Sequence, residues 1–169
     1  MADRLRYVVF GTRWGEFGLL GGESGVFRSC LPACSRQAVE GYLLAGVEEA
    51  GYDEGLFVGV QEKVKAYFDG SYVDFGDVEV VLSMSEFGRR VLGACRDVRY
   101  GQCVSYGGLA KMAGRERSAR AVGGALGQNP VPLIIGCHRI VRSDGKIGGF
   151  SAEGGVELKQ RMLELESKK

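Results

Sequence analysis

The spacing of apolar residues changes character near residue 84 and divides the chain into two halves. Residues 5–31 consist of short β-prone runs separated by glycines, which predicts a small antiparallel meander. Residues 36–49 and 57–68 have the spacing of amphipathic helices, and residues 72–83 (YVDFGDVEVVLS) read as one more strand. We therefore expect a small strand-and-helix domain over residues 1–84.

The second half, residues 85–169, is predicted to begin with three helices. An apolar stripe at helical spacing places Cys95 in the core together with Phe87, Val91 and Val98. Ser105 and Ser118 are candidate N-caps of the next two helices, and the second of these has the sequence SARAVGGALGQN. Two helices joined by a short turn form a helix-turn-helix.

The remainder of this half predicts a hairpin and one more helix. Leu133–Val141 reads as a strand, and Ser143-Asp144-Gly145 is a turn signal before the chain returns. A helix-turn-helix followed by a hairpin is the element order of a winged helix. The chain closes with an amphipathic helix on Leu158, Met162 and Leu165. The expected fold class is α+β.

Composition narrows the class of protein. Hydrophobic residues make up 45% of the chain and charged residues 25%, which is typical of a soluble globular protein. No apolar run approaches the ~20 residues of a membrane span, and the first residues lack the apolar core of a signal peptide, so we expect a cytoplasmic protein that does not bind a membrane. Five scattered cysteines, one histidine and no CxxC pair predict neither a disulfide framework nor a zinc site.

The net charge of +1 conceals an uneven distribution. Residues 1–84 carry 7 basic and 13 acidic side chains, whereas residues 85–169 carry 15 basic and 8 acidic ones. A basic half indicates an anionic partner, and nucleic acid is the first candidate. The alternative is a dipolar protein whose charged faces are only solvated.

One face of the SARAVGGALGQN helix carries almost no side chains. Arg120 lies on it with Gly123, Gly124 and Gly127. Each glycine in a helix interior costs up to about 1 kcal/mol relative to alanine, so three of them require a reason. Close packing against the first domain is one reason, and close approach of a DNA backbone is the other.

Cys137 and His138 are adjacent in the sequence and form a candidate pair of nucleophile and base. A thiol at its ordinary pKa is mostly protonated at neutral pH, and the only histidine of the chain is a candidate base. Neighbours on a strand point to opposite faces, so either the strand breaks at Cys137 or a water relays the proton. A relay histidine also needs a carboxylate to orient it, for which Glu166 is a candidate. Two buried residues without catalytic function remain the alternative.

Three stretches in a fixed order carry a family resemblance. They are VSYGGLAKMAG, then SARAVGGALGQNPVPLIIGCHRIVRSDGKIGGFS, and more weakly KQRMLELE, and together they cover most of residues 85–166. The order and spacing of RAVGGA, NPVP and CHR are highly specific. The sequence resembles the O6-alkylguanine-DNA alkyltransferases, also called methylated-DNA–protein-cysteine methyltransferases. The first half matches only in layout, as the ribonuclease-H-like domain of such proteins.

The resemblance implies a reaction and a role for each site residue. Cys137 is expected to accept the alkyl group of O6-alkylguanine, and to a lesser extent of O4-alkylthymine, in one irreversible transfer that consumes the protein and uses no cofactor. His138 deprotonates the thiol through a water, and Glu166 orients His138. Asn129 braces the loop before the active site, and Tyr106 donates a hydrogen bond to the leaving guanine.

The resemblance also implies the binding residues. Ser151 is similar to a residue that contacts the O6 of guanine in a loop that includes Gly149 and Phe150. The partner is double-stranded DNA, bound by a monomer through the minor groove, and Arg120 fills the space of the nucleotide that flips out. The other implied DNA contacts are Gly107, Arg115, Ala121, Gly123, Gly124 and Ser143.

The chain departs from the family pattern at three places. Gly136 precedes the cysteine where proline is usual, and we expect this glycine to loosen the loop so that proline there would stabilise the protein. Gly149-Phe150 replaces a common Asn-Tyr pair. The first half has none of the histidines that bind zinc in some members, so no metal is expected.

Two other classes of protein compete with this interpretation. A cysteine hydrolase would show turnover, and nothing in the chain resembles its local signatures. A winged-helix regulator would read the major groove with larger side chains than Gly123, Gly124 and Gly127. Non-catalytic alkyltransferase-like proteins carry tryptophan in place of Cys137, so the cysteine itself favours chemistry.

Overall fold

The computed structural model describes residues 2–150, 152 and 154–168. The chain forms two compact units, Met1–Leu82 and Ser83–Lys169, each with its own core. The sequence places the domain boundary after residue 84, at the end of the serine-rich joint. In the structure Ser83 and Ser85 belong to the second unit, and Ser85 caps its first helix.

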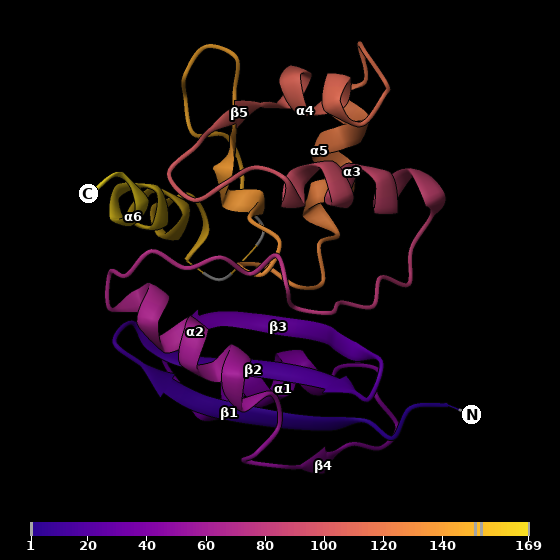
Figure 1. Ribbon diagram of the computed structural model, residues 1–169, viewed down its shortest axis with the longest axis vertical. Helices are drawn as coiled ribbons and strands as arrows, with labels where there is room; N and C mark the ends of the chain where they lie inside the picture. Colours follow the sequence, from indigo (N-terminus) through magenta and orange to yellow (C-terminus); the bar gives the residue numbers. More distant parts are fainter. Residues whose placement is uncertain (1, 151, 153, 169) are drawn as a thin grey trace. The chain divides into compact units, whose positions relative to one another are not determined.

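The first unit is built on a four-stranded sheet (Figure 1). Its strands β1 (Arg6–Thr12), β2 (Gly15–Gly22) and β3 (Gly25–Ala33) form an antiparallel meander, which confirms the predicted one. The short β4 (Gly51–Tyr52) runs parallel to β1, so that the sheet order is β3-β2-β1-β4.

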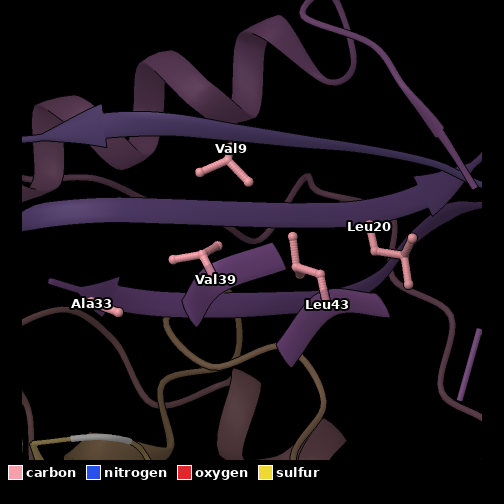
Figure 2. Packing of buried hydrophobic residues seen from close by; sticks show 5 residues of the cluster. All are labelled: Val9, Leu20, Ala33, Val39 and Leu43. Carbon is pink, nitrogen blue, oxygen red and sulfur yellow. The ribbon is translucent and has the colours of Figure 1, made fainter. Parts of the chain in front are cut away.

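Two helices accompany this sheet. Figure 2 shows Val39 and Leu43 of α1 (Arg36–Leu44) packed with side chains of the strands in one buried cluster. α1 is shorter than the predicted helix over residues 36–49. The Arg28 guanidinium caps the end of the helix, because it donates hydrogen bonds to the carbonyls of Tyr42, Leu43 and Ala45. Gly46, with φ +72°, then turns the chain. α2 spans Val58–Phe68, close to the predicted bounds.

The strand predicted over residues 72–83 is wrong. This segment makes only an isolated bridge between Val26 and Val80, although Val73, Phe75 and Val78 are buried. The Asp74 carboxylate accepts a hydrogen bond from the Gly76 amide at 2.8 Å, which turns the chain in the middle of the run. The apolar positions therefore cover the core from an irregular connection.

The second unit contains four α-helices and two very short strands among the described residues. The helices are α3 (Glu86–Arg96), α4 (Tyr106–Met112), α5 (Ala119–Gly127) and α6 (Gly155–Ser167). The predicted cap at Ser105 is confirmed, because its hydroxyl accepts from the Gly108 amide at 2.9 Å. Ser118 is the N-cap residue of α5 but makes no side-chain capping bond. Cys95 is fully buried, as predicted.

The strand predicted over Leu133–Val141 is also wrong. Only β6 (Ile140–Val141) is extended, and it pairs in parallel with β5 (Val104–Ser105). Leu133 has φ +74°, and residues 137–139 form one turn of 3-10 helix, η1. Residues 131–140 are all buried, so this stretch is apolar because it crosses the core. The predicted turn forms, since the Gly145 amide donates to the Arg142 carbonyl, but no second strand follows it within residues 146–150.

Candidate active site

Cys137 lines a pocket in the second unit. It begins η1, and its residue is 9% exposed. The pocket has a volume of about 360 Å³. Its lining residues come from α4, α5, η1 and the loop before α6, and they are Tyr106, Gly123, Leu126, Gly127, Cys137, Gly149 and Phe150. Of the predicted site residues, four therefore meet Cys137 around one cavity.

The thiol of Cys137 is not ionised by its surroundings alone. Burial raises the pKa of Cys137, and this effect exceeds the stabilisation of the thiolate by hydrogen bonding from Asn129 and by the ammonium of Lys159. A nucleophile in this environment requires a base that removes its proton during the reaction.

His138, which follows Cys137 in the chain, forms a buried hydrogen-bonded pair with Glu166. Nε2 of His138 lies 2.6 Å from Oε1 of Glu166, and the two side chains are 0% and 1% exposed. An ionised carboxylate only accepts hydrogen bonds, so Nε2 carries the proton and Nδ1 is the basic nitrogen. The chain is not extended at Cys137, which is one of the two alternatives that the sequence left open, because residues 137–139 form a turn of 3-10 helix. Neighbouring side chains in such a turn do not point to opposite faces as they do on a strand.

The charge states of this pair follow from its environment. Burial lowers the pKa of His138, and the attraction of Glu166 only partly restores it, so the imidazole is neutral at pH 7. Burial alone would raise the pKa of Glu166, but hydrogen bonds from His138 and Arg139 lower it far below its ordinary value. An ionised carboxylate that orients a neutral imidazole is the arrangement of a general base.

Asn129 fixes the segment that leads to Cys137. Its side-chain amide donates to the Ile135 carbonyl at 3.1 Å, and its carbonyl oxygen accepts from the Val131 amide at 3.0 Å. Both bonds are buried and span the turn in which Leu133 has a positive φ. The bracing role that the resemblance implies for Asn129 agrees with this geometry.

Tyr106 and Phe150 provide aromatic rings at the pocket. Tyr106 is the first residue of α4, and burial raises its pKa, so its hydroxyl is protonated and available as a hydrogen-bond donor. A Cβ on Gly148 would lie 3.0 Å from this hydroxyl, and Gly148 has φ +79°, so glycine is required there. Ser151, a predicted substrate contact, lies outside the described residues.

Two charged side chains were not assigned a role from the sequence. The ammonium of Lys159 is buried and donates to the Ile140 carbonyl at 2.6 Å, with the Gly149 carbonyl at 3.4 Å. It lies 5.8 Å and 6.0 Å from the ring centres of Tyr106 and Phe150. Arg139 is 7% exposed and contacts Glu166. The available signals were a lysine at helical spacing with Met162 and Glu166, and an arginine within an apolar run.

The predicted DNA contacts lie mostly on the exposed surface of the second unit. Within that unit, a Cβ on Gly107, Gly124 or Gly127 would meet no described atom within 4 Å, so close packing does not require these glycines. A Cβ on Gly123 would lie 3.9 Å from the Tyr106 ring. The exposed members of the predicted set are Gly107, Arg115, Arg120, Ala121, Gly124 and Ser143.

Two further properties bear on the class of site. No group of three or more His, Cys, Asp or Glu side chains within the described part of the chain could hold a metal ion. Among the described helices, none is both long and apolar enough to cross a bilayer.

Comparison with known proteins identifies the family. The family model of the 6-O-methylguanine DNA methyltransferase DNA-binding domain matches residues 86–168. A methylated-DNA–protein-cysteine methyltransferase of Metallosphaera sedula is 44% identical over 119 residues, which are 70% of this chain and 73% of that protein. The protein of the same name from Mycobacterium tuberculosis is 41% identical over 114 residues, 68% of this chain and 67% of that one.

Solved structures extend the similarity to nearly the whole chain. The crystal structure of Mycobacterium tuberculosis OGT in complex with DNA has a TM-score of 0.81 and 34% identity, and the match covers 96% of this chain and 92% of that one. The structure of the O6-methylguanine methyltransferase of the same organism has a TM-score of 0.78 and 32% identity, over 96% and 93% of the two chains. The chain therefore belongs to the family of the methylated-DNA–protein-cysteine methyltransferases.

Proposed function

We propose that this protein repairs DNA by transferring the alkyl group of O6-alkylguanine, and less efficiently of O4-alkylthymine, to the sulfur of Cys137. The observation that carries the proposal is the position of Cys137, between an open pocket and the buried His138–Glu166 pair. A buried thiol with a raised pKa needs a base to become a nucleophile, and an oriented neutral imidazole can be that base.

The reaction follows from the charge states of these groups. His138 takes the thiol proton at Nδ1 through a water molecule, and Glu166 stabilises the imidazolium that forms. The thiolate attacks the alkyl carbon, the carbon–O6 bond breaks, and its electron pair stays with guanine. Tyr106 donates a hydrogen bond to the leaving base and so offsets this charge.

The product explains why one protein molecule acts once. The new carbon–sulfur bond belongs to a thioether, which is a poor leaving group. No described residue of the pocket other than Cys137 is a thiol that could regenerate it. The transfer is therefore stoichiometric and irreversible.

DNA reaches the pocket through the bare face of α5. Its glycines allow close approach of a sugar-phosphate backbone in the minor groove, and the exposed Arg120 enters the duplex. The O6 alkyl group lies in the major groove, so the damaged nucleotide must flip out to meet Cys137. Because one chain carries both the pocket and this face, a monomer is sufficient.

We also propose a fold family for each of the two domains. The order of three antiparallel strands, a helix and a strand parallel to β1 supports a ribonuclease-H-like first domain. The pair α4 and α5, followed by the turn at residues 142–146, supports a winged-helix-like second domain with α5 as the DNA-binding helix.

Mass spectrometry of the protein after incubation with a duplex containing O6-methylguanine tests this function. We expect one added methyl group, located on Cys137 by peptide mapping, and none in Cys137→Ala. Cys95→Ala is the matched control, because this buried thiol does not line the pocket. A methyl group on Cys95 or Cys103, or transfer by Cys137→Ala, would refute the assignment.

A further inference from the structure

Glu166 binds a cationic side chain in addition to the neutral imidazole of His138. The guanidinium of Arg139 approaches both carboxylate oxygens, with Nη2 2.9 Å from Oε1 and Nε 3.0 Å from Oε2. The Gly101 amide also donates to Oε2 at 3.1 Å. Oε1 therefore accepts hydrogen bonds from the imidazole and the guanidinium together, and the carboxylate is held from two sides.

The guanidinium itself is fixed by a third contact. Its Nη1 donates to the Val98 carbonyl at 2.9 Å, in the segment that follows α3. Arg139 thus joins η1 to this segment and to α6, which carries Glu166. A fork of planar donors restrains the orientation of a carboxylate more than a single bond does.

Gly136 provides the space through which this side chain passes. A Cβ at residue 136 would lie 2.9 Å from Nη1, 3.1 Å from Cδ and 3.1 Å from Cζ of Arg139. The backbone of Gly136, with φ −75°, would accept any residue, including proline. Residue 136 and the Arg139 side chain are therefore in close contact. The stabilisation expected from proline at residue 136 stays a prediction.

We propose that Arg139 is a positioning residue for alkyl transfer, which holds the Glu166 carboxylate in place for His138 and offsets part of the effect of its negative charge. The proposal rests on the function proposed above. Arg139 acts through Glu166 and His138 and touches no reacting atom.

The positive charge of Arg139 disfavours protonation of His138. Burial is the largest cause that lowers the pKa of His138, and the charge of Arg139 adds to it, while Arg139 also lowers the pKa of Glu166. Removing its charge leaves the carboxylate uncompensated and raises the proton affinity of His138. The other titratable groups around this pair are Cys95 on α3, Tyr100 and Cys103 before α4, Cys137 on η1 and Lys159 on α6.

The single histidine of the chain makes the test direct. Nuclear magnetic resonance of the full chain labelled with 15N-histidine reports the tautomer and the titration midpoint of His138 without DNA. We expect the wild type to hold the Nε2-protonated tautomer. Arg139→Met should raise the midpoint by about one pH unit, a tenfold change in proton affinity. Arg142→Met is the matched control, because Arg142 pairs with Asp144 at the surface, and it should leave the midpoint unchanged.

If Arg139→Met does not fold, Arg139→Gln takes its place in the same titration, because the amide also removes the charge. A His138 midpoint that is unchanged in the folded variant would overturn the proposal.

The pH dependence of alkyl transfer tests whether Arg139 affects the reaction as well as the titration of His138. The acidic limb of the single-turnover rate on O6-methylguanine duplex should move to higher pH in Arg139→Met, and Arg139→Lys should restore part of the shift. An unmoved limb would overturn the positioning role. A wild-type protein that shows the expected histidine titration but transfers no alkyl group would refute the proposed function instead.

Discussion

The imidazole of His138 donates from Nε2 to Oε1 of Glu166 over 2.6 Å, and both side chains are shielded from water. This bond fixes which nitrogen of the ring is basic and therefore which direction the proton of Cys137 must take. It connects η1 to the last turns of α6, which are separated by 28 residues in the sequence.

Glu166→Gln should abolish most of the transfer. The amide loses the charge that stabilises the imidazolium, and a general base contributes about 10²–10⁴-fold to a rate. We expect the single-turnover rate on O6-methylguanine duplex to fall by at least about 100-fold, while DNA binding in a gel-shift assay is retained. Stability should fall by about 3–5 kcal/mol, because Arg139 loses its buried counter-charge. A variant with a normal rate would show that Glu166 has only a structural role.

Stability should decrease as the pH falls. The folded pKa values of His138 and Glu166 both lie below their ordinary values of 6.5 and 4.5, so the unfolded chain binds more protons. The contribution of His138 is lost as the pH falls below about 6.5, and that of Glu166 as it falls below about 4.5, at up to about 1.4 kcal/mol per pH unit for each group. Urea unfolding at pH 7.5, 6.0, 5.0 and 4.0 measures this dependence.

His138→Gln is the control for that titration. It should flatten the dependence between about pH 6.5 and 5 and leave the loss below about pH 4.5 in place. A wild-type free energy of unfolding that stays constant from pH 7.5 to 5.0 is incompatible with a buried neutral His138.

Lys159→Met should slow the transfer by making the thiolate less stable. The ammonium lowers the pKa of Cys137 and donates hydrogen bonds to the Ile140 and Gly149 carbonyls. We expect the rate of Cys137 alkylation by iodoacetamide, measured against pH by mass spectrometry, to shift to higher pH. Lys159→Arg retains the charge, and its pH profile should lie between those of the wild type and Lys159→Met. Identical profiles for the wild type and Lys159→Met would exclude an electrostatic role for Lys159.

Arg120→Ala should separate duplex repair from the chemistry. The side chain is exposed on α5 and does not line the pocket, so its proposed task is to hold the flipped nucleotide state, which costs a few kcal/mol of lost stacking. Transfer from an O6-methylguanine duplex should fall by about tenfold or more, while transfer from free O6-benzylguanine stays near the wild-type rate. Equal losses on the two substrates would make Arg120 a structural residue. Ala119→Gly, at the preceding exposed position and outside the set of implied DNA contacts, is the control.

Local chemistry predicted some elements well and others poorly. The meander and the capped start of α4 follow from glycine punctuation and from Ser105, whose signals lie within a few residues. The run Leu133–Val141 failed because burial on all sides makes a strand and an irregular core segment look alike in sequence. The Asx turn at Asp74 interrupted the other predicted strand in the same way.

Some residues of the candidate site were predicted from the sequence, and others were not. Cys137, His138 and Glu166 were predicted from reactivity and from the family resemblance, and the structure places them together. Arg139 and Lys159 were missed because their roles depend on contacts with residues about 20 to 40 positions away, such as Val98 and Ile140. A buried charge is visible in sequence only as an irregularity in an apolar pattern, which does not name its partner.

The stoichiometry of repair tests the central claim most directly. The protein is incubated with a tenfold excess of O6-methylguanine duplex, and the guanines restored per protein molecule are counted until the reaction stops. The account predicts one restored guanine per molecule, one methyl group on Cys137, and no further repair after fresh substrate is added. Continued turnover, or repaired DNA with an unmodified Cys137, would contradict it.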